Sequence, residues 1–174
     1  TLHKKAMYRN IGEALMGFGM LFLGLELLQN AIPTDPDKLL WLTRIQDYGA
    51  FSVLIGFIIG TIITGLLHSS SAFSGIVISL AIKNAIKWEF AAALTLGSNI
   101  GSTIDAVLAA VGTNADAKRS AFIHVLFNIA GTVIVLFAFS PFLKLVTFLT
   151  PGHEHSNIAI RISMLHTVFK TFST

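Results

Sequence analysis

Two clusters of small polar residues interrupt apolar stretches of the chain, and both are rich in groups that bind ions. The first cluster is His68, Ser69, Ser70 and Ser71, at the centre of LLHSSSAFSG. The second is GSNIGST, which contributes Ser98, Asn99, Ser102 and Thr103. A buried hydroxyl or amide costs free energy unless it finds a partner, and each can donate to an anion or offer an oxygen to a cation. The pattern therefore indicates ion binding.

Other polar residues lie near these clusters or share their composition. Thr64 precedes His68 by one helical turn, and Asp105 follows the second cluster, where a charge within an apolar segment is a functional candidate by default. The alternative for Asp105 is a carboxylate near the mouth of a cavity, paired with another residue. His124 and Asn128 share a helix face and are interpreted as structural. His153 and His155 in GHEH are weak evidence for zinc, so no metal site is assigned there.

The composition is that of an integral membrane protein. Of the 174 residues, 53% are hydrophobic and only 12% are charged, about half of the usual 25%. The charges gather between apolar runs that are long enough to enter a bilayer. A net charge of +3 without a basic, aromatic-rich stripe gives no indication of nucleic-acid binding. The absence of cysteine excludes disulfide and thiol chemistry, and the start at Thr1 suggests a piece of a longer polypeptide.

We expect a single all-α membrane domain over residues 1–174. Its predicted elements, in chain order, are a transmembrane helix over 9–31, a re-entrant hairpin over 50–82, a broken helix over 88–112, a transmembrane helix with a kink near Pro141 over 118–149, and the start of a further helix over 157–174.

The hairpin is predicted from the lengths of its two apolar arms. Ala50–Leu67 has 18 residues, but Ala72–Ile82 has only 11, which makes the second arm about 16 Å long, half of the hydrocarbon thickness. Such a hairpin enters the membrane, turns within it and returns to the same side. The alternative is one continuous helix whose serine hydroxyls bond back to the preceding turn.

The segment 88–112 is predicted to be a discontinuous transmembrane helix. Glycines in GSNIGST would relieve strain in an unwound backbone, and the freed carbonyls could coordinate cations. In transporters, such half-helices place their positive ends near anions.

Three motifs in this order resemble the type II sodium–phosphate cotransporter family and its bacterial relatives. They are TGLLHSSSAFSGIVISLA, LTLGSNIGSTIDAVLAA and SAFIHVLFNIAG, and the opening MGFGMLFLGLELL is similar to a lead helix of that family. The resemblance runs from Arg9 to about Phe169. The family carries Q-S-S-S where this chain has His68, and T-[TS] where it has Ser102 and Thr103; because histidine can be protonated, pH dependence or altered substrate preference becomes an expectation. Family members have two inverted repeats, whereas this chain has one.

The resemblance implies a multi-pass transporter of the cell membrane that moves inorganic phosphate with sodium by alternating access, without a cofactor. Its partners would be the two ions, the lipid bilayer, and a second repeat in the same longer polypeptide or in a second copy of the chain. The residues expected to contact phosphate or sodium are Thr64, His68, Ser69, Ser70, Ser71, Ser98, Asn99, Ser102, Thr103 and Asp105. Sodium would use oxygens of Ser69, Ser71, Asn99 and Thr103.

Three alternatives stay open. A carrier of the same fold could move another anion or couple transport to protons through His68. A non-transporting membrane assembly subunit would use the serines for packing. An intramembrane enzyme with a Ser-His pair is disfavoured, because His68 is adjacent to Ser69, no G-x-S-x-G turn is present, and the sequence places no carboxylate to orient the imidazole.

Overall fold

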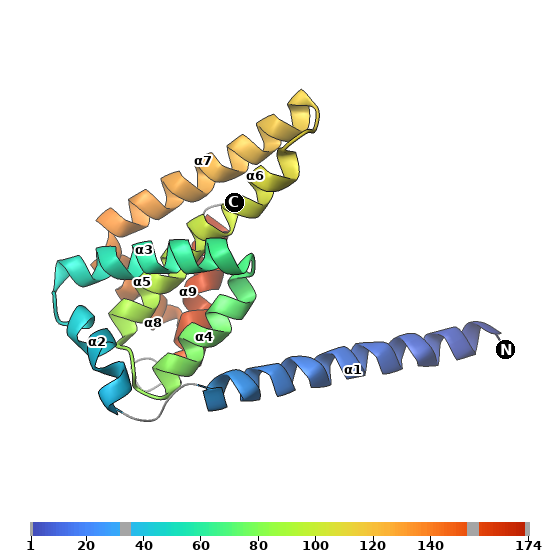
Figure 1. Cartoon of the computed structure of the whole chain (residues 1–174), viewed down its shortest axis with the longest axis horizontal. Helices are drawn as coiled ribbons and strands as arrows, with labels where there is room; N and C mark the ends of the chain where they lie inside the picture. The colour runs from blue at the N-terminus through green and yellow to red at the C-terminus, as the bar shows by residue number, and fades with distance from the viewer. Residues whose placement is uncertain (1, 32–35, 153–156, 173–174) are drawn as a thin grey trace.

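The computed structural model describes residues 2–31, 36–152 and 157–172, and these residues form helices and turns without a β-strand. This confirms the predicted all-α class. The helices are α1 (Leu2–Ala31), α2 (Pro36–Gln46), α3 (Ala50–Leu67), α4 (Ser70–Ile82), α5 (Trp88–Gly101), α6 (Thr103–Ala110), α7 (Ala115–Phe137), α8 (Phe139–Leu149) and α9 (Ile158–Phe172) (Figure 1).

Three helices in the described part of the chain are long and apolar enough to cross a membrane. They are α1, through its segment Ala6–Leu28, α3 and α7. α1 extends away from the other helices toward the N-terminus (Figure 1), and its large apolar side chains, such as Phe18 and Phe22, are exposed. An apolar surface of this extent is typical of contact with lipid, which agrees with a membrane-embedded protein.

α5 is the central helix of the fold, and nearly every side chain from Phe90 to Asn99 is buried. On one side, Phe90 and Leu94 pack with residues of α2, α4 and α9. On the other side, Leu96 packs with residues of α7, α8 and α9. The polar cluster of GSNIGST therefore lies at the end of the most buried element.

α3 packs against α5 through glycines, which let the two backbones approach closely. A Cβ atom added to Gly60 would lie 2.2 Å from the carbonyl oxygen of Leu94, and one added to Gly97 would lie 2.1 Å from that of Phe57. Added Cβ atoms would bring Gly56 against Phe90 and Gly101 against Thr61, so α3 and α5 run in the same direction. This register brings the end of α3 to the junction of α5 and α6.

The break between α7 and α8 falls at Ala138, three residues before Pro141. Pro141 lies in the first turn of α8, where a helix does not need the N–H that proline lacks. α8 then buries Phe142, Leu143 and Val146 against the rest of the fold, and α9 packs beside it.

Candidate functional site

A turn of two residues, His68 and Ser69, separates α3 from α4. His68 has left-handed backbone dihedrals (φ 51°), and its N–H donates to the carbonyl of Thr64 at 3.0 Å, closing α3. Ser69 is extended and caps α4, because its Oγ accepts from the N–H of Ala72 at 3.2 Å. The structure therefore has two helices here and not one continuous helix.

Away from the turn, side chains join the segment that leads into α3 to the loop that follows α4. The buried amide of Gln46 donates to the carbonyl of Ala85 at 3.1 Å and accepts from the N–H of Lys87. Asp47 pairs with the ammonium of Lys87 at 2.7 Å, and this hydrogen bond raises the pKa of Lys87 above its ordinary value. The two ends of the hairpin thus lie close together. That it enters the membrane from one side stays a prediction.

A hydrogen bond between His68 and Asp105 joins the hairpin turn to α6. Nδ1 of His68 lies 2.6 Å from Oδ1 of Asp105, and the two side chains are 52% and 47% exposed. The expectation that no carboxylate orients this imidazole was wrong. The two residues are 37 positions apart in sequence, and the parallel packing of α3 on α5 brings them together.

The hydroxyl of Ser69 does not bond to His68 in the described part of the chain. It lies 3.4 Å from the hydroxyl of Ser71 and accepts from Ala72. Nucleophilic catalysis requires the base within hydrogen-bond reach of the nucleophile. His68 therefore has a carboxylate partner, as the histidine of a catalytic triad does. Among the described residues, however, no hydrogen bond joins His68 to Ser69, so the serine is not placed for nucleophilic attack.

The helix is interrupted within GSNIGST, in line with the predicted break, but the backbone does not unwind there as predicted. Gly97–Gly101 belong to α5, and only Ser102 interrupts the helix, with helical dihedrals (φ −68°, ψ −15°) and its N–H bonded to the carbonyl of Ser98 at 3.0 Å. The carbonyls of Asn99 and Ile100 accept from the hydroxyls of Ser102 and Thr103, at 2.9 and 2.7 Å. The glycines allow close packing on α3, since a Cβ on Gly101 would lie 2.5 Å from the carbonyl oxygen of Thr61.

Three predicted site residues are almost fully buried and keep an unpaired oxygen. Thr64 and Ser98 are 0% exposed and Asn99 is 1% exposed. Among the described residues, Oγ1 of Thr64, Oγ of Ser98 and Oδ1 of Asn99 have no hydrogen-bond partner. Because buried polar atoms in native proteins are nearly always paired, these oxygens are available to an ion or to water.

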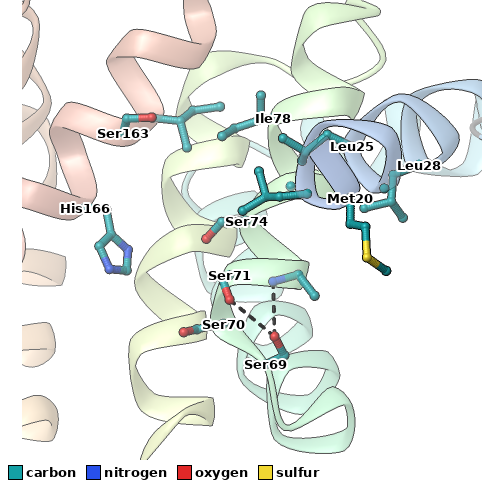
Figure 2. A pocket seen from close by; sticks show the side chains of 15 residues that line it. Met20, Leu25, Leu28, Ser69, Ser70, Ser71, Ser74, Ile78, Ser163 and His166 are labelled. Carbon is teal, nitrogen blue, oxygen red and sulfur yellow. Dashed lines mark hydrogen bonds between the residues drawn. The ribbon is translucent and has the colours of Figure 1, made fainter. Parts of the chain in front are cut away.

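The serine cluster opens onto a cavity of about 790 Å³ between α1, α4 and α9 (Figure 2). Ser69, Ser70 and Ser71 line it, whereas the other predicted site residues do not. The cavity adds polar residues that the sequence analysis missed: Ser74, Ser163 and His166. Their spacing was an available signal, because Ser74 lies four residues after Ser70 and His166 three after Ser163, on the same faces of apolar helices.

Comparison with known proteins identifies the family of the chain. The model of the Na+/Pi-cotransporter family matches residues 42–173. The chain is 33% identical over 142 residues to uncharacterized protein YqeW of Bacillus subtilis (strain 168), covering 80% of this chain and 44% of that protein. It is 40% identical over 102 residues to sodium-dependent phosphate transport protein 2C of Rattus norvegicus, and 36% identical over 131 residues to protein 2B of Homo sapiens.

These two matches cover 56% and 72% of this chain but 17% of each relative. The chain thus spans less than half the length of the curated relatives it matches. No solved structure matches it. The matched region holds the hairpin, its serine cluster and all of α5, and the chain belongs to the Na+/Pi-cotransporter family.

Proposed function

We propose that this chain is part of a multi-pass symporter of the cell membrane that couples the movement of inorganic phosphate to sodium. The observation that carries the proposal is the hairpin turn: two apolar helices meet at His68 and Ser69 and present three consecutive serines to a cavity. The model of the Na+/Pi-cotransporter family matches residues 42–173, which include this turn, and relatives that bear the name sodium-dependent phosphate transport protein match 56% and 72% of the chain.

The chemistry of the turn suits a small anion that must also be released. Hydroxyls donate hydrogen bonds to phosphate oxygens without the strong attraction of an arginine pair. Ser69, Ser70 and Ser71 are the proposed phosphate donors, with His68 beside them. Ser102 and Thr103 hold the junction of α5 and α6 through their bonds to backbone carbonyls.

Sodium binds oxygen ligands, and the unpaired oxygens of Thr64, Ser98 and Asn99 support a site near the contact of α3 with α5. Oxygens of Ser69, Ser71 and Thr103 complete the set that we propose for sodium. Asp105 would add negative charge at the same end of the hairpin.

Alternating access needs a structural counterpart that moves relative to this unit. We propose that a second repeat provides it, in the same longer polypeptide or in a second copy of the chain. The hairpin of α3 and α4 would be the re-entrant element of this half.

A proton-coupled carrier of the same fold, for phosphate or another anion, is the second candidate. The 2.6 Å contact of His68 with Asp105 favours it, because it places a carboxylate against a histidine, a residue type that serves as a proton shuttle.

Uptake of radiolabelled phosphate into proteoliposomes, with and without an inward sodium gradient, tests the proposal. The protein is reconstituted in its native assembly as wild type, Ser70→Ala and Ser140→Ala, the last being an exposed serine on α8 outside the cavity. We expect uptake that requires sodium, is lost in Ser70→Ala and is kept in Ser140→Ala. Uptake driven only by a proton gradient would support the second candidate, and no uptake would support an assembly subunit.

A further inference from the structure

The cavity beside the serine cluster has a polar end that two helices form together. Ser70 and Ser74 share one face of α4, because they are four residues apart. Figure 2 shows His166 on the α9 side of the cavity, facing the part of α4 that carries these two serines. The opposite wall is apolar and comes from α1, mainly through Leu25 and Leu28.

His166 differs from the other histidines whose side chains the structure describes. His68 pairs with Asp105, and Nε2 of His124 lies 3.3 Å from the amide of Asn128. Nδ1 of His166 is buried and has no hydrogen-bond partner among the described residues. Because Nδ1 is enclosed, a ligand in the cavity would meet the ring at its other nitrogen, and His166 lines that cavity.

The charges around the polar end favour an anion. None of the described residues that line the cavity is acidic. Lys170 lies one turn after His166 on α9, with its ammonium 3.3 Å from Oδ1 of Asn128. Ser163, His166 and Lys170 are spaced by three and four residues, so they follow one face of the helix.

We propose that His166 is a specificity-determining residue of the phosphate site, binding the ion from α9 while Ser70 and Ser74 bind it from α4. This rests on the proposed function and places the phosphate between α4 and α9, away from GSNIGST. A tetrahedral ion needs hydrogen-bond donors from more than one direction, and the hydroxyls of α4 approach it from a single side. Neutral imidazole also has one donor and one acceptor nitrogen, so it can bind an oxyanion that carries its own proton, as monobasic phosphate does and sulfate at neutral pH does not.

Equilibrium binding of radiolabelled phosphate to the purified protein, in its native assembly and in a maltoside detergent, tests this. The variants are His166→Leu, His166→Gln and the matched control His124→Leu, on α7 outside the cavity. We expect His166→Leu to raise the Kd for phosphate about tenfold, the loss of one hydrogen bond to a charged group. His166→Gln, which keeps a donor and an acceptor, should retain most of the affinity, and His124→Leu should match wild type. Competition by sulfate should be stronger in His166→Leu than in wild type.

Wild-type phosphate affinity in His166→Leu would overturn the inference. If that variant fails to fold, nitrogen NMR of the histidine side chains in the wild-type protein provides the test. We expect added phosphate to shift the resonance of His166 and to leave that of His124 unchanged. The opposite pattern would contradict the inference.

Two further outcomes separate this inference from the proposed function. If sodium-driven uptake is lost in Ser70→Ala but both binding and uptake are unchanged in His166→Leu, only the role of His166 fails. If wild type binds no phosphate, both fail. Short-chain phosphatidic acid forms a separate arm, because its headgroup carries the same phosphoryl chemistry beside an apolar chain that α1 could accept. Binding of this lipid that depends on His166, without binding of inorganic phosphate, would overturn the inference as well.

Discussion

At the scale of single residues, Asp105 is a candidate ion-binding residue whose contact with His68 contributes little to the free energy of unfolding. Both side chains are about half exposed, and an exposed ion pair contributes about 0–1 kcal/mol. We therefore expect Asp105→Asn to change the free energy of unfolding by less than about 1 kcal/mol but to weaken the sodium dependence of phosphate uptake, since it removes a negative charge at the hairpin turn. Asp116→Asn, whose carboxylate is 89% exposed and pairs with Arg119, is the control. Unchanged sodium dependence and charge movement in Asp105→Asn would exclude Asp105 as a cation ligand.

The same residues mark how far sequence reasoning reaches at this scale. Ser69, Ser70 and Ser71 could be selected because hydroxyls in an apolar segment need partners, and they do line a cavity. The partner of Asp105 could not be predicted, because the contact joins residues 37 positions apart and depends on the register of α3 on α5. His166 was not predicted as a site residue: its spacing from Ser163 places the two on one helix face, but the cavity itself is formed by three helices and depends on their packing.

At the scale of the helices, close packing of α3 on α5 requires glycine at Gly60 and Gly97. A methyl group on Gly97 would lie 2.1 Å from a backbone oxygen of α3, which cannot rotate away as a side chain can. We expect Gly97→Ala to lower the free energy of unfolding by about 1–3 kcal/mol, measured by thermal unfolding in detergent. Gly17→Ala on α1 is the matched control, because nothing lies within 4 Å of its added Cβ. Equal stability of the two variants would contradict the helix contact.

The helices also show why the prediction of an unwound backbone over GSNIGST was wrong, although the helix does break there between α5 and α6. The change from apolar to polar residues correctly marks the boundary between α3 and α4. His68 ends α3 in a left-handed conformation, and Ser69 caps the start of α4. The glycines of GSNIGST carry two readings, an unwound backbone or a close helix contact, and the sequence alone does not separate them. In the structure the backbone stays helical, and the hydroxyls of Ser102 and Thr103 donate to carbonyls of the preceding turn.

At the scale of the whole molecule, the hairpin predicts where its ends lie relative to the membrane. Tyr48 and Asn84 are exposed residues at the two tied ends of α3 and α4, and the chain contains no cysteine. If α3 and α4 form a hairpin in the membrane, a membrane-impermeant thiol reagent must label Tyr48→Cys and Asn84→Cys from the same side. Thr113→Cys, in the loop between α6 and α7, is the reference position with which both are compared. Labelling of the two positions from opposite sides would contradict the hairpin in the membrane.

The central claim for the whole molecule is the coupling of the two ions, and coupling is reciprocal: if sodium drives phosphate, phosphate must drive sodium. The most direct measurement is therefore the accumulation of radioactive sodium in proteoliposomes under an inward phosphate gradient, with no sodium gradient at the start. We predict transient accumulation of sodium above its external concentration, lost in Ser70→Ala and kept in Ser140→Ala. Sodium that only equilibrates, in liposomes that do take up phosphate, would contradict sodium symport and leave the proton-coupled carrier as the account of this family member.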